Sequence, residues 1–149
     1  MNGELYQKHG VCFRYPGAWE VDESGDVEAI TVTLSTAQTG FWSITIMPDR
    51  PRPEEVMETS VSAFAESYPE MDRYSTTGKL GGHPYLKEEL EFVCHDLIST
   101  AELLAIRTGR ITILIMCQYY DQEEADLKPL FAAVTNSLTF DAGDEVIIN

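Results

Sequence analysis

Cysteine and histidine, the residue types that most often act as nucleophiles or metal ligands, occur next to each other once, at Cys94 and His95. They lie in a run with the alternating pattern of a β-strand, where neighbouring side chains point to opposite faces of the sheet. The two side chains therefore cannot share one site. Cys94 falls on the same face as Phe92, so we expect a buried structural thiol. We expect His95 on the opposite face, in solvent or beside a carboxylate.

The other two histidines also lack the spacing of a metal site. His9 and His83 stand alone, and the chain contains no His-x-x-x-His or Cys-x-x-Cys pair. Nucleotide-binding glycine loops and the Gly-x-Ser-x-Gly nucleophile motif are absent as well. We expect His83, which precedes Pro84 in a glycine-containing turn, to lie at the surface. The sequence predicts no catalytic residue, no metal and no cofactor.

Carboxylates offer one alternative site. Glu88, Glu89 and Glu91 form an acidic stretch in which Glu89 and Glu91 share a strand face. Such a pair could bind calcium or act as general acid and base, but a shared face alone positions neither water nor substrate. We interpret the stretch as a solvated sheet face. The alternative function is a small-ligand-binding protein or an enzyme that uses this acidic site.

Aromatic residues at strand ends are the main candidates for binding a partner. We expect Tyr15, Tyr119 and Tyr120 to line an exposed groove, because a tyrosine combines an apolar ring with a polar hydroxyl group. Trp42 is a further candidate, although a tryptophan at this place in a strand most often belongs to the core.

The C-terminal segment ends in three β-branched residues, Val146, Ile147 and Ile148. These follow an acidic stretch and would be unusual in a free tail. We hypothesise that they add a strand to a sheet edge, either in the same chain or in a second copy, which would give a homodimer.

The elements that position these residues follow from hydrophobic periodicity. Alternating apolar residues predict strands over residues 11–15, 19–21, 29–34, 41–47, 73–79, 85–95, 98–107 and 111–120. The intervening residues 22–26 are expected to form a charged loop. Glycines and prolines near residues 16–17, 40 and 81–84 supply turns.

Two helices are predicted. The first begins at Pro53, which suits the first helical turn, and ends at Pro69. The second begins with a capping box at Asp121 and Glu124. Pro129 should break its first turn, so that the helix becomes regular after about residue 128.

The order of these elements, four strands and a helix twice over, indicates the α+β class. We expect one domain over residues 1–149, with a core at about 10–140 and an acidic tail at 141–149. A twisted antiparallel sheet would be flanked by the two helices. If the last three strands form a meander, Cys94 and Cys117 lie about 9–10 Å apart, beyond the reach of a disulfide. Free thiols are therefore expected.

Charge limits the range of partners. The chain has 25 acidic and 10 basic residues, a net charge of -15, and would be repelled by nucleic acids and by anionic membranes. A protein with a basic patch would be attracted. No signal peptide or membrane-spanning run is evident, and three cysteines suit a reducing compartment. The expected location is the cytoplasm.

Three segments resemble the PsbP-like superfamily. They are Gly10–Val21, the turn Gly81-Gly82-His83-Pro84-Tyr85, and the final Asn136–Phe140. That superfamily includes PsbP, the Mog proteins, DcrB-type proteins and the Eag chaperones of type VI secretion. The resemblance covers roughly residues 10–140 and implies an α/β/α sandwich. It also implies a role in binding, assembly or chaperoning.

The leading hypothesis is therefore a non-catalytic cytoplasmic module that binds another protein, as an adaptor or chaperone. It predicts an exposed apolar or aromatic patch rimmed by acidic residues, for instance on the open face of the sheet. A small-ligand protein or enzyme would instead need a deep pocket with perturbed titratable groups. A third alternative is a subunit that associates only with itself.

Overall fold

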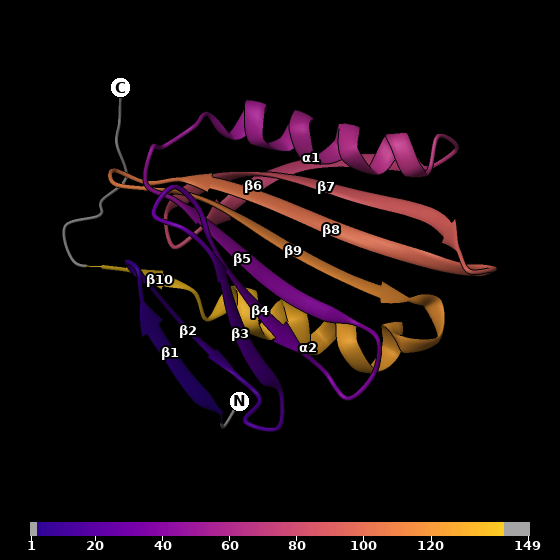
Figure 1. Cartoon of the computed structure of the whole chain (residues 1–149), viewed down its shortest axis with the longest axis horizontal. Coiled ribbons are helices and arrows are strands. Elements are labelled where there is room, and N and C mark those ends of the chain that lie inside the picture. The colour runs from indigo at the N-terminus through magenta and orange to yellow at the C-terminus, as the bar shows by residue number, and fades with distance from the viewer. Residues whose placement is uncertain (1–2, 142–149) are drawn as a thin grey trace.

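A computed structural model describes residues 3–141 of the chain. A large antiparallel sheet runs through the middle of the molecule, with one helix on each face and a small second sheet beside the second helix (Figure 1). The predicted α+β class and the antiparallel sheet flanked by two helices are confirmed. Val146, Ile147 and Ile148 lie outside the described residues, so the tail hypothesis stays a prediction.

The large sheet has seven strands in the order β3-β4-β5-β9-β8-β7-β6. They are β3 (Glu20–Gly25), β4 (Ile30–Ser35), β5 (Phe41–Met47), β6 (Asp72–Leu80), β7 (His83–Cys94), β8 (Leu97–Arg107) and β9 (Thr112–Tyr120). The strand β9, which is apolar on both faces as a central strand is, lies in the middle. The strands β7, β8 and β9 form the expected meander.

The small sheet contains a strand that the sequence pattern missed. It is built from β1 (Glu4–Lys8), β2 (Val11–Tyr15) and β10 (Thr139–Phe140). In β1 only Tyr6 is buried, so the strand gives almost no alternating signal. The turn that follows it, through His9 and Gly10 with positive φ, was the feature from which the strand could have been predicted.

The prediction of a charged loop at residues 22–26 was wrong. Residues 20–25 form β3, an edge strand that pairs only with β4 and whose side chains are all exposed. Polar side chains suit an edge strand because they remain in solvent. An exposed strand of this kind lacks the apolar alternation on which strand prediction depends.

The first helix, α1 (Pro53–Ser67), begins as predicted and buries Met57 and Val61. The second, α2 (Glu124–Asn136), follows the 3-10 turn η1 (Asp121–Glu123). The prediction of a regular helix only after residue 128 was wrong, because α2 runs through Pro129. Pro129 lies inside the helix and has no N–H to donate to the carbonyl of Ala125.

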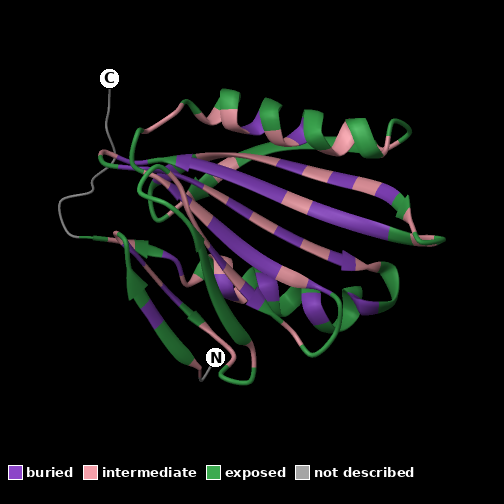
Figure 2. Ribbon diagram, in the orientation of Figure 1, coloured by how far each residue is buried: buried purple, intermediate pink, exposed green. Residues whose placement is uncertain are grey.

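The sheet separates two hydrophobic clusters (Figure 2). The larger cluster joins α2, the small sheet and one sheet face, and contains Trp42 and Phe131. The smaller joins α1 to the other face, through Met57 and Leu90. Neither described helix is long and apolar enough to cross a membrane.

Candidate protein-binding groove

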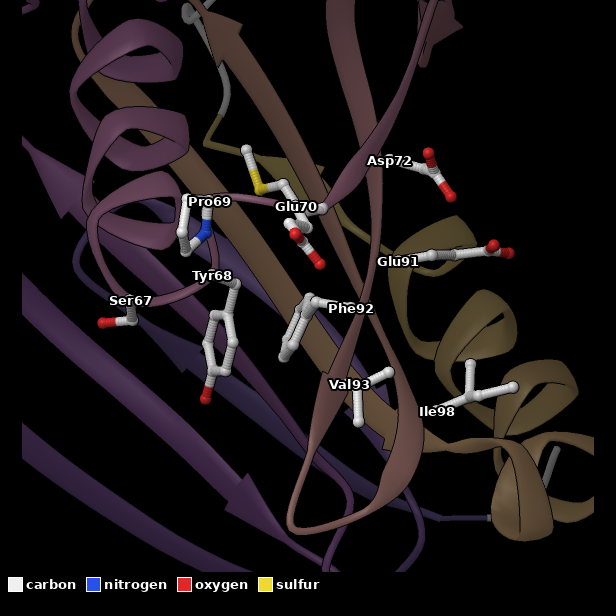
Figure 3. Close-up of a pocket in the computed structure, with 10 residues that line it drawn as sticks. Ser67, Tyr68, Pro69, Glu70, Asp72, Glu91, Phe92, Val93 and Ile98 are labelled. Atoms are coloured by element: carbon white, nitrogen blue, oxygen red, sulfur yellow. The ribbon is translucent and has the colours of Figure 1, made fainter.

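A groove of about 520 Å³ opens where the C-terminal end of α1 meets the tip of the β7–β8 hairpin (Figure 3). One wall is the segment that leaves α1, from Ser67 to Asp72. The other wall is formed by Glu91–Val93 of β7 and by Ile98 of β8. We call this site the hairpin groove. Its walls come from segments far apart in the sequence, which the sheet brings together.

The hairpin groove follows an open strand edge. The strand β6 begins at Asp72, opposite Glu91, so residues 92–94 of β7 have β8 as their strand neighbour on one side only. Val93 and Ile98 pair across the hairpin and are 65% and 53% exposed. Single exposed aliphatic residues are common, but a facing pair beside an open strand edge is the kind of surface that another chain covers.

Aromatic side chains form the floor of the groove. Phe92 is buried and stacks on Tyr68 of the α1 segment, with 4.2 Å between the ring centroids. The Tyr68 hydroxyl donates a hydrogen bond to Cys94 Sγ at 3.3 Å. This hydrogen bond, together with burial, raises the pKa of Tyr68. The floor is therefore apolar, and the hydrogen bond to Cys94 holds the Tyr68 ring in place.

Carboxylates form the rim. Glu70, Asp72 and Glu91 line the groove, and no lysine or arginine does. Asp72 and Glu91 lie directly opposite each other on neighbouring strands, where their two negative charges repel each other. Their effect reaches Tyr74, whose pKa is raised by the charges of Glu91 and Asp72. The rim therefore attracts a positively charged group.

Comparison with known proteins gives a fold but no close relative. No family model and no curated protein matches the chain. Cyanobacterial PsbP (CyanoP) from Synechocystis is similar over 93% of this chain and 92% of its own, with a TM-score of 0.66 and 14% identity. The chain has a PsbP-like fold.

Two further structures share the PsbP-like fold. LpqN of Mycobacterium tuberculosis, described as involved in cell envelope biogenesis, matches 87% of this chain and 82% of its own at a TM-score of 0.58 and 11% identity. A Bacteroides thetaiotaomicron protein matches 97% of this chain at a TM-score of 0.65 and 17% identity. The chain spans 51% of the length of that protein. Identities this low establish the fold alone.

The aromatic residues predicted to bind a partner fall in different places within the PsbP-like fold. Tyr15 is half-buried and lines a separate shallow groove beside Leu5 and Val21. Tyr120 is half-buried, with its hydroxyl 3.9 Å from Cys94 Sγ. Neither residue lines the hairpin groove.

Two of the aromatic candidates cannot be surface anchors. Trp42 is fully buried, and its indole N–H donates a hydrogen bond to Thr135 Oγ1 at 2.9 Å. Tyr119 is buried and donates to Glu102 Oε2 at 2.9 Å. Both lie on the sheet face covered by α2, so their proposed role in partner binding is corrected to a role in the core.

The histidine predictions also need correction. His83 is buried and packs edge-on against Phe140, with 4.9 Å between ring centroids, because β7 already begins at this residue. His95 is exposed, as expected, but it is not in a strand. It forms the β7–β8 turn together with Asp96, and both have positive φ. Cys94 is half-buried and free, as are Cys12 and Cys117.

The acidic stretch is divided between the two faces of the sheet. Glu88 is buried on the α1 side, where Arg73 donates to it at 2.8 Å and lowers its pKa against the effect of burial. On the other face, Glu89 Oε1 lies 3.9 Å from Lys128 Nζ, and Glu91 belongs to the hairpin groove. No group of three metal-ligating side chains occurs within residues 3–141. The three carboxylates therefore do not converge on one site.

A second cluster of titratable groups lies beneath α2. Glu102 accepts hydrogen bonds from Tyr119 and from Lys87, whose Nζ is 3.0 Å from Oε1. Burial, reinforced by the charge of Glu102, raises the pKa of the adjacent Cys117 thiol well above its usual range. Cys117 is therefore held in the protonated form, which is a poor nucleophile.

Proposed function

We propose that this protein is a non-catalytic protein-binding module and that the hairpin groove holds a short extended segment of a partner protein. The observation that carries the proposal is the exposed Val93–Ile98 pair, set at an open strand edge and rimmed by carboxylates. A patch of this composition was expected from the sequence. It lies at the hairpin tip rather than on the open face of the sheet.

The chemistry of the groove specifies the partner segment. An open strand edge provides main-chain pairing, the Val93–Ile98 pair packs against an aliphatic side chain, and the acidic rim pairs with lysine or arginine. The partner segment is therefore apolar and basic. Because the rim is exposed to solvent, added salt weakens the attraction.

The proposal also covers the superfamily branch of the protein and its location in the cell. We place the chain among the binding and chaperone branches of the superfamily, such as the Mog-like, DcrB-type and Eag-chaperone-like proteins. Its strong negative charge supports a protein partner rather than a nucleic acid or an anionic membrane. Three free cysteines support a reducing location, the cytoplasm.

Short synthetic peptides test the proposal directly. Peptides that combine valine or leucine with lysine or arginine are titrated against the protein by fluorescence anisotropy, at low and at high salt. We expect them to bind, and we expect glutamate-substituted versions not to bind. Val93→Asp should weaken binding by about tenfold, equivalent to about 1.4 kcal/mol.

Val27→Asp is the matched control, since Val27 is 87% exposed and lies outside the groove. This substitution adds the same charge to the protein and should leave peptide affinity unchanged. Equal losses in the two variants would mean that net charge and not the groove governs binding. A lack of binding by every apolar and basic peptide would exclude the proposed occupant.

A further inference from the structure

A crevice of about 260 Å³ lies between α2 and the sheet, away from the hairpin groove. We call it the α2 crevice. The chain contains only four lysines, at positions 8, 79, 87 and 128. Three of them line this crevice, together with a single carboxylate, that of Glu102. The walls are thus positively charged in a protein whose net charge is -15.

The interior of the α2 crevice is apolar. Leu104 and Ile115 contribute from the sheet and Phe131 from α2, and all three are buried side chains of the larger hydrophobic cluster. Tyr85 and Leu80 complete the apolar lining. An apolar chamber with charged groups at its boundary is typical of a site for a small amphipathic molecule.

One of the three lysines is paired closely with the carboxylate of the crevice, and the other two have only distant ion pairs or none with the described residues. Lys87 is bound to Glu102 at 3.0 Å, and Tyr119 donates to the same carboxylate. Lys128 lies at 3.9 and 4.0 Å from Glu89 and Glu124, at the limit of an ion pair. Lys79 makes no ion pair with any described residue. Two ammonium groups are therefore available to an anion from solution.

We propose that the α2 crevice binds a small organic anion. Its carboxylate would pair with Lys79 and Lys128, and its apolar body would pack against Leu104, Ile115 and Phe131. A neutral ligand would gain only the apolar contact, and a simple inorganic anion only the charge contact. The site binds without covalent chemistry, because the Cys117 thiol that lines it stays protonated.

Lysines on edge strands also have another use, since they discourage pairing with other chains. Lys79 lies on the edge strand β6 and could serve only that purpose. In that case its removal would promote self-association but would leave the affinity for a small anion unchanged. The two roles therefore predict different results.

Benzoate is a suitable probe, with benzamide as its neutral counterpart. Each is titrated into the full-length protein while amide shifts are followed by two-dimensional NMR. We expect benzoate to shift amides of β8, β9 and α2 around Leu104, Ile115 and Phe131, with a dissociation constant on the order of 1 mM, a usual value for so small a ligand. Benzamide should bind at least several-fold more weakly.

Lysine variants locate the charge contact. The double substitution Lys79→Gln and Lys128→Gln should weaken benzoate binding by about tenfold and leave benzamide binding unchanged. Lys8→Gln, which removes the one lysine outside the crevice, is the control and should have no effect. Equal affinity for benzoate and benzamide, equal losses in the double variant and the control, or no shift of the crevice amides would each overturn the assignment.

Discussion

Glu123 is a buried carboxylate that joins two segments distant in the sequence. It accepts hydrogen bonds from the Thr39 amide and hydroxyl at 2.8 Å, from the Gly40 amide at 3.1 Å and from the Tyr120 amide at 3.0 Å. The β4–β5 loop is thereby fixed to the end of β9. This glutamate, and not the predicted Glu124, forms the reciprocal contact of the capping box.

These hydrogen bonds set the ionisation of Glu123. Burial of the carboxyl acts to raise its pKa, but hydrogen bonds from Tyr120, Thr39 and Gly40 outweigh burial and lower the pKa below the ordinary 4.5. A carboxyl group with a lowered pKa in the folded state stabilises the fold above its unfolded-state pKa. That contribution is lost as the pH falls through the folded-state value.

Substitution of Glu123 should therefore change stability and its pH dependence together. Glu123→Gln should lower the free energy of unfolding at neutral pH by about 1–3 kcal/mol, because an amide cannot accept all four hydrogen bonds. It should also flatten the loss of stability below about pH 4.5. Urea denaturation across this pH range measures both effects. The exposed Glu55→Gln is the control and should change stability by less than about 0.5 kcal/mol.

Single residues also show which environments could be predicted from the sequence. The free state of Cys94 follows from the predicted order of the last three strands, which keeps it away from Cys117. The burial of His83 does not, because it depends on Phe140, which comes from a distant segment. Local pattern assigns a residue to a strand face, but long-range packing decides whether that face is covered.

Among the elements, the two neighbouring hairpin turns show what turn prediction can detect. The β6–β7 turn uses Gly81 and Gly82, both with positive φ, and was evident from the sequence. The β7–β8 turn has the same length and uses His95 and Asp96, also with positive φ. Without glycine to mark it, the predicted break fell one residue late, at residues 96–97. The exposed strands β1 and β3 were missed or shortened for the related reason that they carry little apolar alternation.

The strained hairpin turn gives a prediction with a defined sign. Asp96→Gly should stabilise the protein by up to about 1 kcal/mol, because glycine adopts a positive φ without steric cost. Thermal unfolding measures the change. The reverse substitution in the neighbouring turn, Gly82→Ala, should destabilise by a similar amount. The same sign for both substitutions would contradict this explanation.

For the molecule as a whole, class and layering could be predicted, but the binding surface could not. Elements in the order found here favour a sheet between helices, and the three resemblance segments indicated the PsbP-like fold that the structural comparison supports. The hairpin groove depends on β6 beginning at Asp72, which leaves the end of β7 uncovered. No local pattern specifies where one strand ends relative to its neighbour.

The unequal division of the core has a consequence for motion. The cluster beneath α1 is much smaller than the one beneath α2, and α1 packs mainly against β7 and β8. Local opening of a segment costs less free energy when fewer apolar contacts hold it. Amide hydrogen exchange should therefore be faster in α1 than in α2, and a uniform rate in both helices would contradict this expectation.

Such opening would act on the hairpin groove, because the segment that leaves α1 forms one of its walls. An occupant that bridges this wall and the β7–β8 tip would hold α1 against the sheet. Exchange in α1 should then slow when a peptide binds, while exchange in α2 stays the same. The exchange rate of α1, the helix held by the smaller hydrophobic cluster, would thus report whether the hairpin groove is occupied.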